Sequence, residues 1–405
     1  MKHGYVDEEL ILKDDNKESA HSESIKIKNS NPPTLAIREG RLLSIDVFRG
    51  LTLVFMVLVN SPGHPEFAYP PLKHAPWNSW TPTDLVFPLF IFIVGVAIPY
   101  SLDRRRLAVE NRSVSLYLQI IRRSVLLFLL GLFLHGYPYF DFSTIRIMGI
   151  LQRIGIVYLM GSMLYLWLNP RQLAITAGII TIAYFILMKF VPVPGVGAGV
   201  LEPVGNWGQF IDSKIMPGHL GNKTWEAKSL LGNIPALASA LIGVLAGITL
   251  RSDKTAHEKI IRFFFAGNVL IVFGLIWDAW FPINQDLWSS SLILFTGGIS
   301  LVMLASCYWL VDVRKSIWWT KPFVIFGVNS ILVWVGSKMG IRTLEVIKVS
   351  QANGSATDLK TWIWQNIYAP WAGDLHGSEA FAITYVFLWF GILAFLYSRR
   401  IFLKV

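Results

Sequence analysis

The sequence predicts an all-α protein: a polytopic bundle of about ten transmembrane helices with both termini on the cytoplasmic side. Three observations predict this fold class. Hydrophobic residues make up 53% of the 405-residue chain, and charged residues only 15%. The mean hydropathy of +0.50 lies well above that of ordinary soluble domains. Long apolar runs, near the roughly 20 residues that cross a bilayer, alternate with polar connections.

Each predicted helix is an apolar run that begins and ends at charged residues or at Pro, Gly and Asn. The first run begins near Ile45, after a polar N-terminal stretch that lacks the features of a signal peptide, so we expect a retained helix. The predicted spans, in chain order, are 45–60, 84–102, 118–136, 145–168, 171–190, 230–250, 261–281, 287–310, 322–340 and 380–399.

The distribution of Lys and Arg predicts the orientation of these spans. Alternate connections are rich in basic residues, which places them in the cytoplasm and leaves the intervening connections outside. Both terminal stretches fall on the basic side, so an even number of spans fits. The basic residues of the cytoplasmic set are Arg104, Arg105, Arg106, Arg112, Arg171, Arg251, Lys254, Lys259, Arg262, Arg314, Lys315, Lys321, Arg399, Arg400 and Lys404.

Composition also divides the chain and excludes several functions. Residues 1–43 are polar and poor in aromatics, which predicts a disordered cytoplasmic tail before a transmembrane domain at 44–405. The net charge of +10 resides in topological clusters, so nucleic-acid binding is not expected. Cys307 is the only cysteine, which excludes an intrachain disulfide. The chain has no HExxH, paired CxxC, phosphate-loop or GxSxG motif, and no metal site is predicted.

Polar chemistry is concentrated on the predicted outer side. Three long outer connections, about 61–83, 191–229 and 341–378, are rich in Pro, Gly, Trp and Asn, and long loops of this kind are often functional. Five of the eight histidines fall on this side: His64, His74, His135, His219 and His376.

The first outer loop contains the best candidate for a reactive group. Its prolines stiffen the backbone around His74, and the neighbouring Lys73 favours the neutral imidazole that a general base or nucleophile presents. Asn60 ends the first span, where its amide can stabilise an oxyanion, and Asp84 begins the second, where its carboxylate can orient the imidazole. Simpler alternatives are an interfacial histidine bound to a loop carbonyl, and helix capping by Asp84.

Polar residues inside spans are expensive to bury and often face an internal cavity. Asp46 and Arg49 are spaced for an i,i+3 ion pair at the cytoplasmic end of the first span. Arg153, about two turns into the fourth span, is a candidate for binding an anion or a buried carboxylate. Asn329, in the middle of the ninth span, binds a ligand or bridges helices.

Several segments resemble the heparan-α-glucosaminide N-acetyltransferase family and its bacterial relatives. The resemblance rests on RLLSIDVFRGLTLVFMVLVN at Arg41–Asn60 and LKHAPWNSWTPTDLVFPLFIFIVG at Leu72–Gly95. Further similar segments extend it over nearly everything after the tail, including RIMGILQRIGIVYL at Arg146–Leu159 and KPFVIFGVNSILVW at Lys321–Trp334.

The resemblance implies an acetyltransferase that moves an acetyl group from cytosolic acetyl-CoA to the amine of a glucosamine-type sugar across the membrane. It places the active-site histidine of the family at His74 and its asparagine at Asn60. Arg49, Arg153 and Asn329 then become candidate contacts for CoA. Whether the histidine is acetylated or acts as a base in a ternary complex stays open. The alternative is an amino-sugar permease on the same scaffold.

The resemblance also sets expectations for location and assembly. The chain has no folded domain before its first span, which favours a bacterial cytoplasmic membrane over a lysosomal one. Glucosamine, or an oligosaccharide that carries it, is the expected acceptor. The family implies a homodimer, a state that nothing in the sequence proves.

Overall fold

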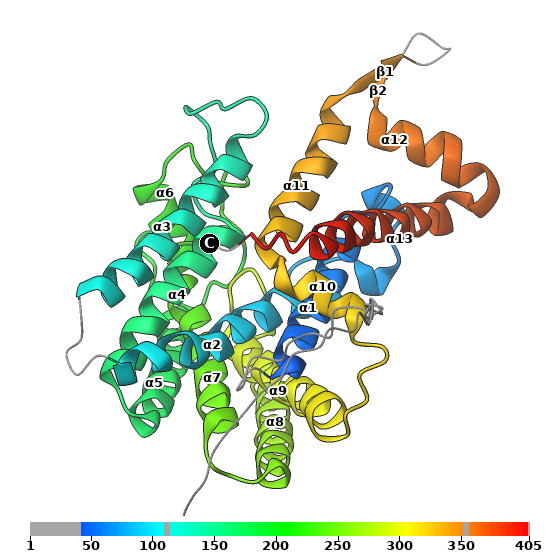
Figure 1. The fold of residues 1–405 in the computed structure, drawn as a ribbon. Coiled ribbons are helices and arrows are strands. Elements are labelled where there is room, and N and C mark those ends of the chain that lie inside the picture. Colours follow the sequence, from blue (N-terminus) through cyan, green and yellow to red (C-terminus); the bar gives the residue numbers. More distant parts are fainter. Residues whose placement is uncertain (1–41, 109–113, 351–355, 404–405) are drawn as a thin grey trace, which may run out of the picture. The chain divides into compact units, whose positions relative to one another are not determined.

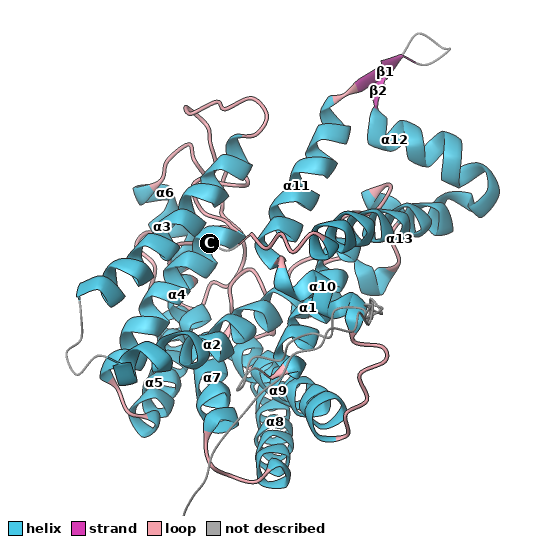
Figure 2. Ribbon diagram, in the orientation of Figure 1, coloured by secondary structure: helices cyan, strands magenta, loops and turns pink. Residues whose placement is uncertain are grey.

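The computed structural model describes residues 42–108, 114–350 and 356–403, with side chains at 103–108 left aside. This part of the chain is almost entirely helical, with one short hairpin (Figures 1 and 2). The all-α prediction is therefore confirmed. The predicted tail lies outside the described residues apart from its last two positions, as do Arg112 and Lys404.

A helix corresponds to each of the ten predicted segments. Among the described residues, eight helices are long and apolar enough to cross a membrane, or nine when α10 and α11 count as one broken span. α1 has 17 residues, at the lower limit for a span. The helices that correspond to the ten predicted segments are α1 Leu43–Val59, α2 Pro82–Ala108, α3 Val114–Gly136, α4 Ile150–Trp167, α5 Pro170–Phe190, α7 Asn233–Arg251, α8 Ala256–Asp278, α9 Ser290–Cys307, α10 Lys321–Val328 with α11 Ser330–Val346, and α13 Ala369–Ser398.

The prediction of a long loop at 341–378 is wrong. α11 continues to Val346, and the antiparallel strands β1 Lys348–Ser350 and β2 Ala356–Asp358 follow. The chain then forms α12 Leu359–Ile363 and a π-helical turn, Trp364–Tyr368, that leads directly into α13 (Figure 1). Asp358 caps α12, since its carboxylate accepts a hydrogen bond from the Thr361 N–H at 2.9 Å. Burial raises the pKa of the Asp358 carboxyl, but its hydrogen bonds with Thr361 and with its own backbone lower it by more, so the pKa lies below its ordinary value.

The remaining connections are irregular, as predicted. The first outer loop contains two 3₁₀ turns, Pro65–Phe67 and Pro70–Leu72. The second contains α6 Trp207–Ile215, which begins at Asn206, whose side chain accepts from the Gln209 N–H at 2.9 Å. α9 continues as a π-helical turn, Tyr308–Val313.

Glycines allow the central helices to pack closely. A Cβ placed on Gly243 of α7 would lie 2.1 Å from the carbonyl oxygen of Phe92 in α2, and one on Gly95 would lie 2.0 Å from that of Ala240. Contacts between small residues of this kind are typical of helix packing in membranes. The apolar stretches of α2 and α7 are accordingly 67% and 72% buried, compared with 17% for α8. α2 and α7 thus form the centre of the bundle.

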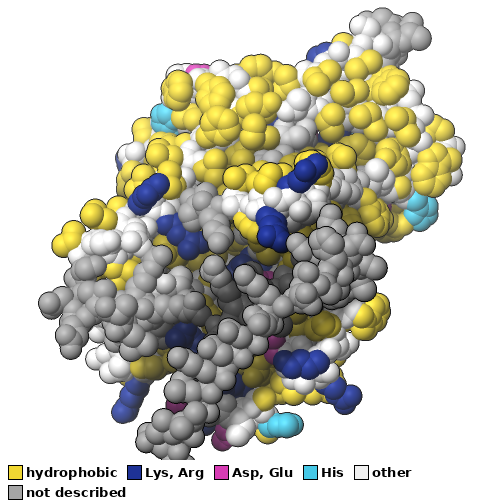
Figure 3. All heavy atoms as spheres, in the orientation of Figure 1, with side chains coloured by type: hydrophobic (Ala, Val, Ile, Leu, Met, Phe, Trp, Pro, Cys, Tyr) yellow, Lys and Arg dark blue, Asp and Glu magenta, His cyan; other side chains and the backbone are white. Residues whose placement is uncertain are grey.

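The outward faces of the peripheral helices are strongly apolar. Large hydrophobic side chains of α3, α5, α8 and α13 are exposed, and such side chains cover much of the face drawn in Figure 3. A soluble monomer rarely exposes so much contiguous apolar surface, whereas a lipid bilayer covers it. The protein is an integral, multi-pass membrane protein. Its orientation stays a prediction, and "outer end" below means the end of the bundle that carries the first outer loop.

Candidate active site

The first outer loop is held from two sides. Near its start, the N–H of Gly63 donates to the carbonyl oxygen of Ser378 in α13 at 3.0 Å. Near its end, the side-chain amide of Asn284, between α8 and α9, donates to the carbonyl oxygen of Trp77 at 3.0 Å. His74 lies between these two anchors, so its backbone is fixed by helices far away in the sequence. Sequence reasoning missed both anchors, because neither belongs to a motif within the loop.

His74 and Asp84 form a hydrogen-bonded pair, with 2.6 Å between the imidazole Nδ1 and the carboxylate Oδ1. The other carboxylate oxygen, Oδ2, accepts from the backbone N–H groups of Ala75 at 3.0 Å and Thr81 at 2.9 Å. The contact with Thr81 is the backward reach of a residue in the first helical turn that stabilises a helix start. The carboxylate of Asp84, the third residue of α2, therefore contacts both the start of this helix and the imidazole, and its role in catalysis stays a prediction.

The pairing defines which ring nitrogen can react. A carboxylate only accepts, so Nδ1 is the donor to Asp84, and in the neutral imidazole Nε2 is the nitrogen that carries the lone pair. The His74 side chain is 57% exposed and the Asp84 side chain 5%. The imidazole is therefore open to the outer side while its partner is buried, which is the geometry of a base or nucleophile oriented by a carboxylate.

Asn60 ends α1, as predicted, and its amide is engaged on both sides. Nδ2 donates to the carbonyl oxygen of Met56 at 2.8 Å, and Oδ1 accepts from Nζ of Lys338 in α11 at 2.8 Å. One amide hydrogen is thus used within α1 and a second is left to donate. Sequence reasoning missed Lys338, although an ionisable residue inside a predicted span is a signal that could have found it.

Arg153 lies in the first turn of α4, because this helix begins at Ile150 and not near residue 145. The prediction that it lies two turns into the span is wrong. Its side chain is fully buried, with Nη2 donating to the carbonyl oxygen of Ser229 at 3.2 Å and the guanidinium 5.0 Å from the Trp288 ring centroid. Nε and Nη1 have no hydrogen-bond partner among the described residues. The guanidinium also lies 5.9 Å from the ring centroid of Phe87, which is three residues after Asp84.

Arg49 and Asn329 both lie away from Arg153, Arg49 beside Gly327 of α10 and Asn329 at the break between α10 and α11. The ion pair of Arg49 with Asp46 is confirmed at 3.4 Å, and Arg49 Nη1 also lies 3.5 Å from the carbonyl oxygen of Gly327. The two helices are bent by 82° at Asn329. The prediction that Asn329 lies in the middle of one continuous helix is therefore wrong. Its side chain donates to Ile401 O at 3.3 Å and accepts from Leu403 N at 3.0 Å, which ties the C-terminal segment to the break.

The residue before Arg49 packs against the middle of α2. The ring centroid of Phe48 lies 6.4 Å from that of Phe92. Phe92 is the midpoint of the apolar stretch Pro82–Leu102 of α2. Arg49 lies beside Gly327 of α10, whereas Arg153 lies in the first turn of α4. The predicted contacts for CoA divide into two separate groups.

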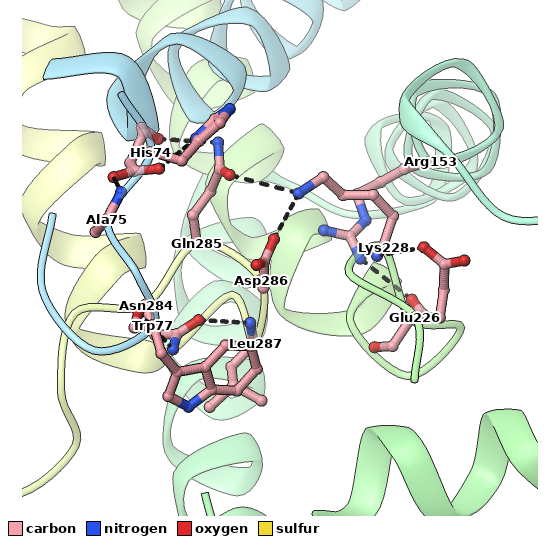
Figure 4. Close-up of polar contacts among 12 residues, drawn as sticks. His74, Ala75, Trp77, Arg153, Glu226, Lys228, Asn284, Gln285, Asp286 and Leu287 are labelled. Carbon is pink, nitrogen blue, oxygen red and sulfur yellow. Dashed lines mark hydrogen bonds and ion pairs between the residues drawn. The ribbon is translucent and has the colours of Figure 1, made fainter. Parts of the chain in front are cut away.

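A polar network extends from Asp84 to the second outer loop (Figure 4). Gln285 contacts the backbone of Asp84, and Lys228 contacts both Gln285 and Asp286. Next to it, the Arg146 guanidinium pairs with the buried carboxylate of Glu226. In the part of the chain that the structure describes, no group of three or more His, Cys, Asp or Glu side chains is arranged to hold a metal ion.

Comparison with known proteins decides the family. The profile of the catalytic region of heparan-alpha-glucosaminide N-acetyltransferase matches residues 41–277, more than half of the chain. The chain belongs to the heparan-alpha-glucosaminide N-acetyltransferase family. The matched residues include His74, Asp84 and Asn60, and they end before Asn329.

Two curated relatives of this family are similar over most of the chain. Heparan-alpha-glucosaminide N-acetyltransferase of Mus musculus is 30% identical, in an alignment that covers 76% of this chain and 55% of the mouse protein. The same enzyme of Homo sapiens is 29% identical, covering 74% of this chain and 53% of the human protein. The chain thus spans about half the length of these members of the family.

Proposed function

We propose that the protein is a membrane-bound N-acetyltransferase, which transfers an acetyl group from acetyl-CoA to the amine of an extracytoplasmic glucosamine-type sugar. Membership of the family supports the reaction class. The observation that carries the proposal is the pairing of His74 with the buried Asp84 at 2.6 Å, with Nε2 left open at the outer face. The amine acceptor approaches from that face.

In the proposed reaction, Nε2 of His74 takes a proton from the attacking amine. The new N–C bond forms at the thioester carbonyl, the C–S bond breaks, and the proton passes from the imidazolium to the CoA thiolate. Asp84 stabilises the imidazolium through Nδ1. A two-step route uses the same atom. Nε2 attacks the thioester carbonyl, the C–S bond breaks and the CoA thiolate leaves; the amine then attacks the acetyl carbonyl, the bond to Nε2 breaks, and the proton of the amine passes to the thiolate.

Asn60 is proposed to stabilise the oxyanion that develops on the acetyl carbonyl. Its second amide hydrogen is the available donor, and Lys338 holds the amide carbonyl at 2.8 Å. This role explains why an asparagine ends α1 where the first outer loop begins.

Acetyl-CoA is proposed to enter from the cytoplasmic side and to meet Arg49. This side chain is partly exposed and lies 3.5 Å from the carbonyl oxygen of Gly327, beside the break at Asn329. Arg153 is proposed to act nearer the pair of His74 and Asp84, called the dyad from here on, where charge-assisted bonds from its buried guanidinium are strong.

Arg49→Gln is expected to raise the Kd for acetyl-CoA about tenfold, measured by equilibrium binding. Unchanged affinity in both Arg49→Gln and Arg153→Gln contradicts these assignments.

A bacterial cytoplasmic membrane, a glucosamine acceptor and a homodimer complete the proposal, each carried by the family resemblance.

The functional test uses detergent-purified protein with labelled acetyl-CoA and glucosamine. Acetylated sugar from the wild type, and none from His74→Ala, is the expected result. Uptake of glucosamine into proteoliposomes without any acetylated product would instead show the amino-sugar permease.

A further inference from the structure

Pro88 leaves the backbone carbonyl of Asp84 without its usual partner. In an α-helix, each carbonyl oxygen accepts from the N–H four residues later. The residue four positions after Asp84 is Pro88, inside α2, and proline has no N–H. Since Asp84 is buried, its carbonyl needs another donor.

Gln285 supplies that donor from the connection between α8 and α9. Its side-chain Nε2 donates to the carbonyl oxygen of Asp84 at 3.2 Å, and the Gln285 side chain is itself buried (Figure 4). The other end of the amide, Oε1, accepts from Nζ of Lys228 at 3.4 Å, and that ammonium pairs with Asp286 at 2.9 Å. The ammonium fixes the orientation of the amide, because only the amide oxygen can accept from it.

Two adjacent residues therefore hold the two halves of the dyad. Asn284 binds the loop of His74 through the carbonyl of Trp77, and Gln285 binds the helix turn of Asp84. One short segment outside both elements thus contacts each of them, in addition to the direct bonds between Asp84 and the loop. A displacement of about 1 Å in such a pair is enough to lose much of its catalytic effect.

We propose that Gln285 is a positioning residue for acetyl transfer: it replaces the hydrogen bond that Pro88 removes and so aligns Asp84 with His74. The inference rests on the proposed function. It predicts that loss of Gln285 lowers kcat only while residue 88 is a proline.

The test is a double-substitution cycle on the full-length protein in detergent. Gln285→Met keeps the side-chain length but has no donor, and is expected to lower kcat about tenfold while KM for acetyl-CoA changes less than twofold. Pro88→Ala restores a backbone N–H and is expected to retain most of the wild-type kcat. In the double variant the N–H restored at position 88 serves the Asp84 carbonyl, so kcat returns to within about threefold of that of Pro88→Ala.

Pro99→Ala is the matched control, because Pro99 is the other proline inside α2 and its carbonyl partner is Gly95. Gln285→Met combined with Pro99→Ala is expected to stay as slow as Gln285→Met alone. Melting midpoints of all variants show that each one is folded. The inference is overturned if Pro88→Ala does not raise the kcat of Gln285→Met, or if Pro99→Ala raises the kcat of Gln285→Met equally well. An inactive wild type would instead overturn the proposed function.

Discussion

Asp84 is the residue on which most contacts of the candidate site converge. One carboxylate oxygen binds His74, the other binds the N–H groups of Ala75 and Thr81, and its backbone carbonyl binds Gln285. A side chain held by this many bonds has one orientation. Its partner imidazole is therefore oriented as well, although that ring is largely exposed.

Asp84→Asn is expected to lower kcat by about 100-fold or more, because a neutral amide no longer stabilises the imidazolium. It also turns an NH₂ group toward backbone donors, at a cost of about 1–3 kcal/mol in stability. Steady-state kinetics and melting midpoints measure the two effects. Glu379→Gln is the control, since Glu379 binds the same loop through the Tyr69 N–H at 3.3 Å and does not contact His74. An equal loss of kcat in both variants would contradict the role of Asp84.

Asp212 of α6 predicts a pH dependence of stability. It is fully buried, and burial raises its pKa from 3.8 to about 6. Between these values the folded protein holds a proton that the unfolded chain releases, so stability falls as the pH rises through this window and levels off above it. At neutral pH the loss is at most on the order of 3 kcal/mol. Asp212→Asn removes the ionisation. The melting midpoint of this variant minus that of the wild type should therefore increase from pH 4 to pH 7. A constant difference between the two midpoints would refute this.

Close packing of α2 against α7 is the feature at the scale of elements that the site depends on. Gly243→Val places a Cβ that would lie 2.1 Å from the Phe92 carbonyl oxygen, so these helices must separate. We expect a loss of about 2 kcal/mol or more, seen as a lower melting midpoint and less monodisperse protein. Gly178→Val makes the same change in intrinsic helix propensity on α5, where a Cβ meets nothing within 4 Å, and should stay near wild type. Equal effects of the two substitutions would contradict the central packing of α2 and α7.

The apolar runs predicted where helices lie, because about 20 apolar residues have few alternatives to a membrane-crossing helix. They predicted helix ends less well. Residues 145–149 are apolar except for Arg146 but are not helical, and α4 begins only at Ile150. Gly373, with a φ of 75°, kinks α13, and the polar residues around it led us to expect a loop. The break at Asn329 was missed because a continuous run of hydropathy does not record a bend.

At the candidate site, the sequence singled out His74 because it lies in a proline-stiffened loop, and Asp84 because it begins the next helix. It did not predict Gln285 or Lys338, whose roles depend on contacts made across the bundle. Pro88 was visible in the sequence, and the carbonyl that it leaves unpaired was a signal for an external donor. Which side chain supplies that donor is decided only by the tertiary fold.

At the scale of the whole molecule, the predicted orientation can be tested directly. In a Cys307→Ser background the chain has no other cysteine. Lys223→Cys lies in the second outer loop and Asp253→Cys in the connection between α7 and α8, where both Lys223 and Asp253 are exposed. A membrane-impermeant maleimide added to intact cells should label the first variant and not the second. The reverse pattern would invert the topology and place His74 in the cytoplasm.

The most direct test of the account is the rate of labelled acetyl transfer to glucosamine by His74→Ala, measured with and without added imidazole. The account predicts a rate below about 1% of wild type, because a positioned base contributes about 100-fold or more. Added imidazole should restore part of that rate, since the side chain removed is 57% exposed. Transfer by His74→Ala at the wild-type rate, with no response to imidazole, would contradict the central claim.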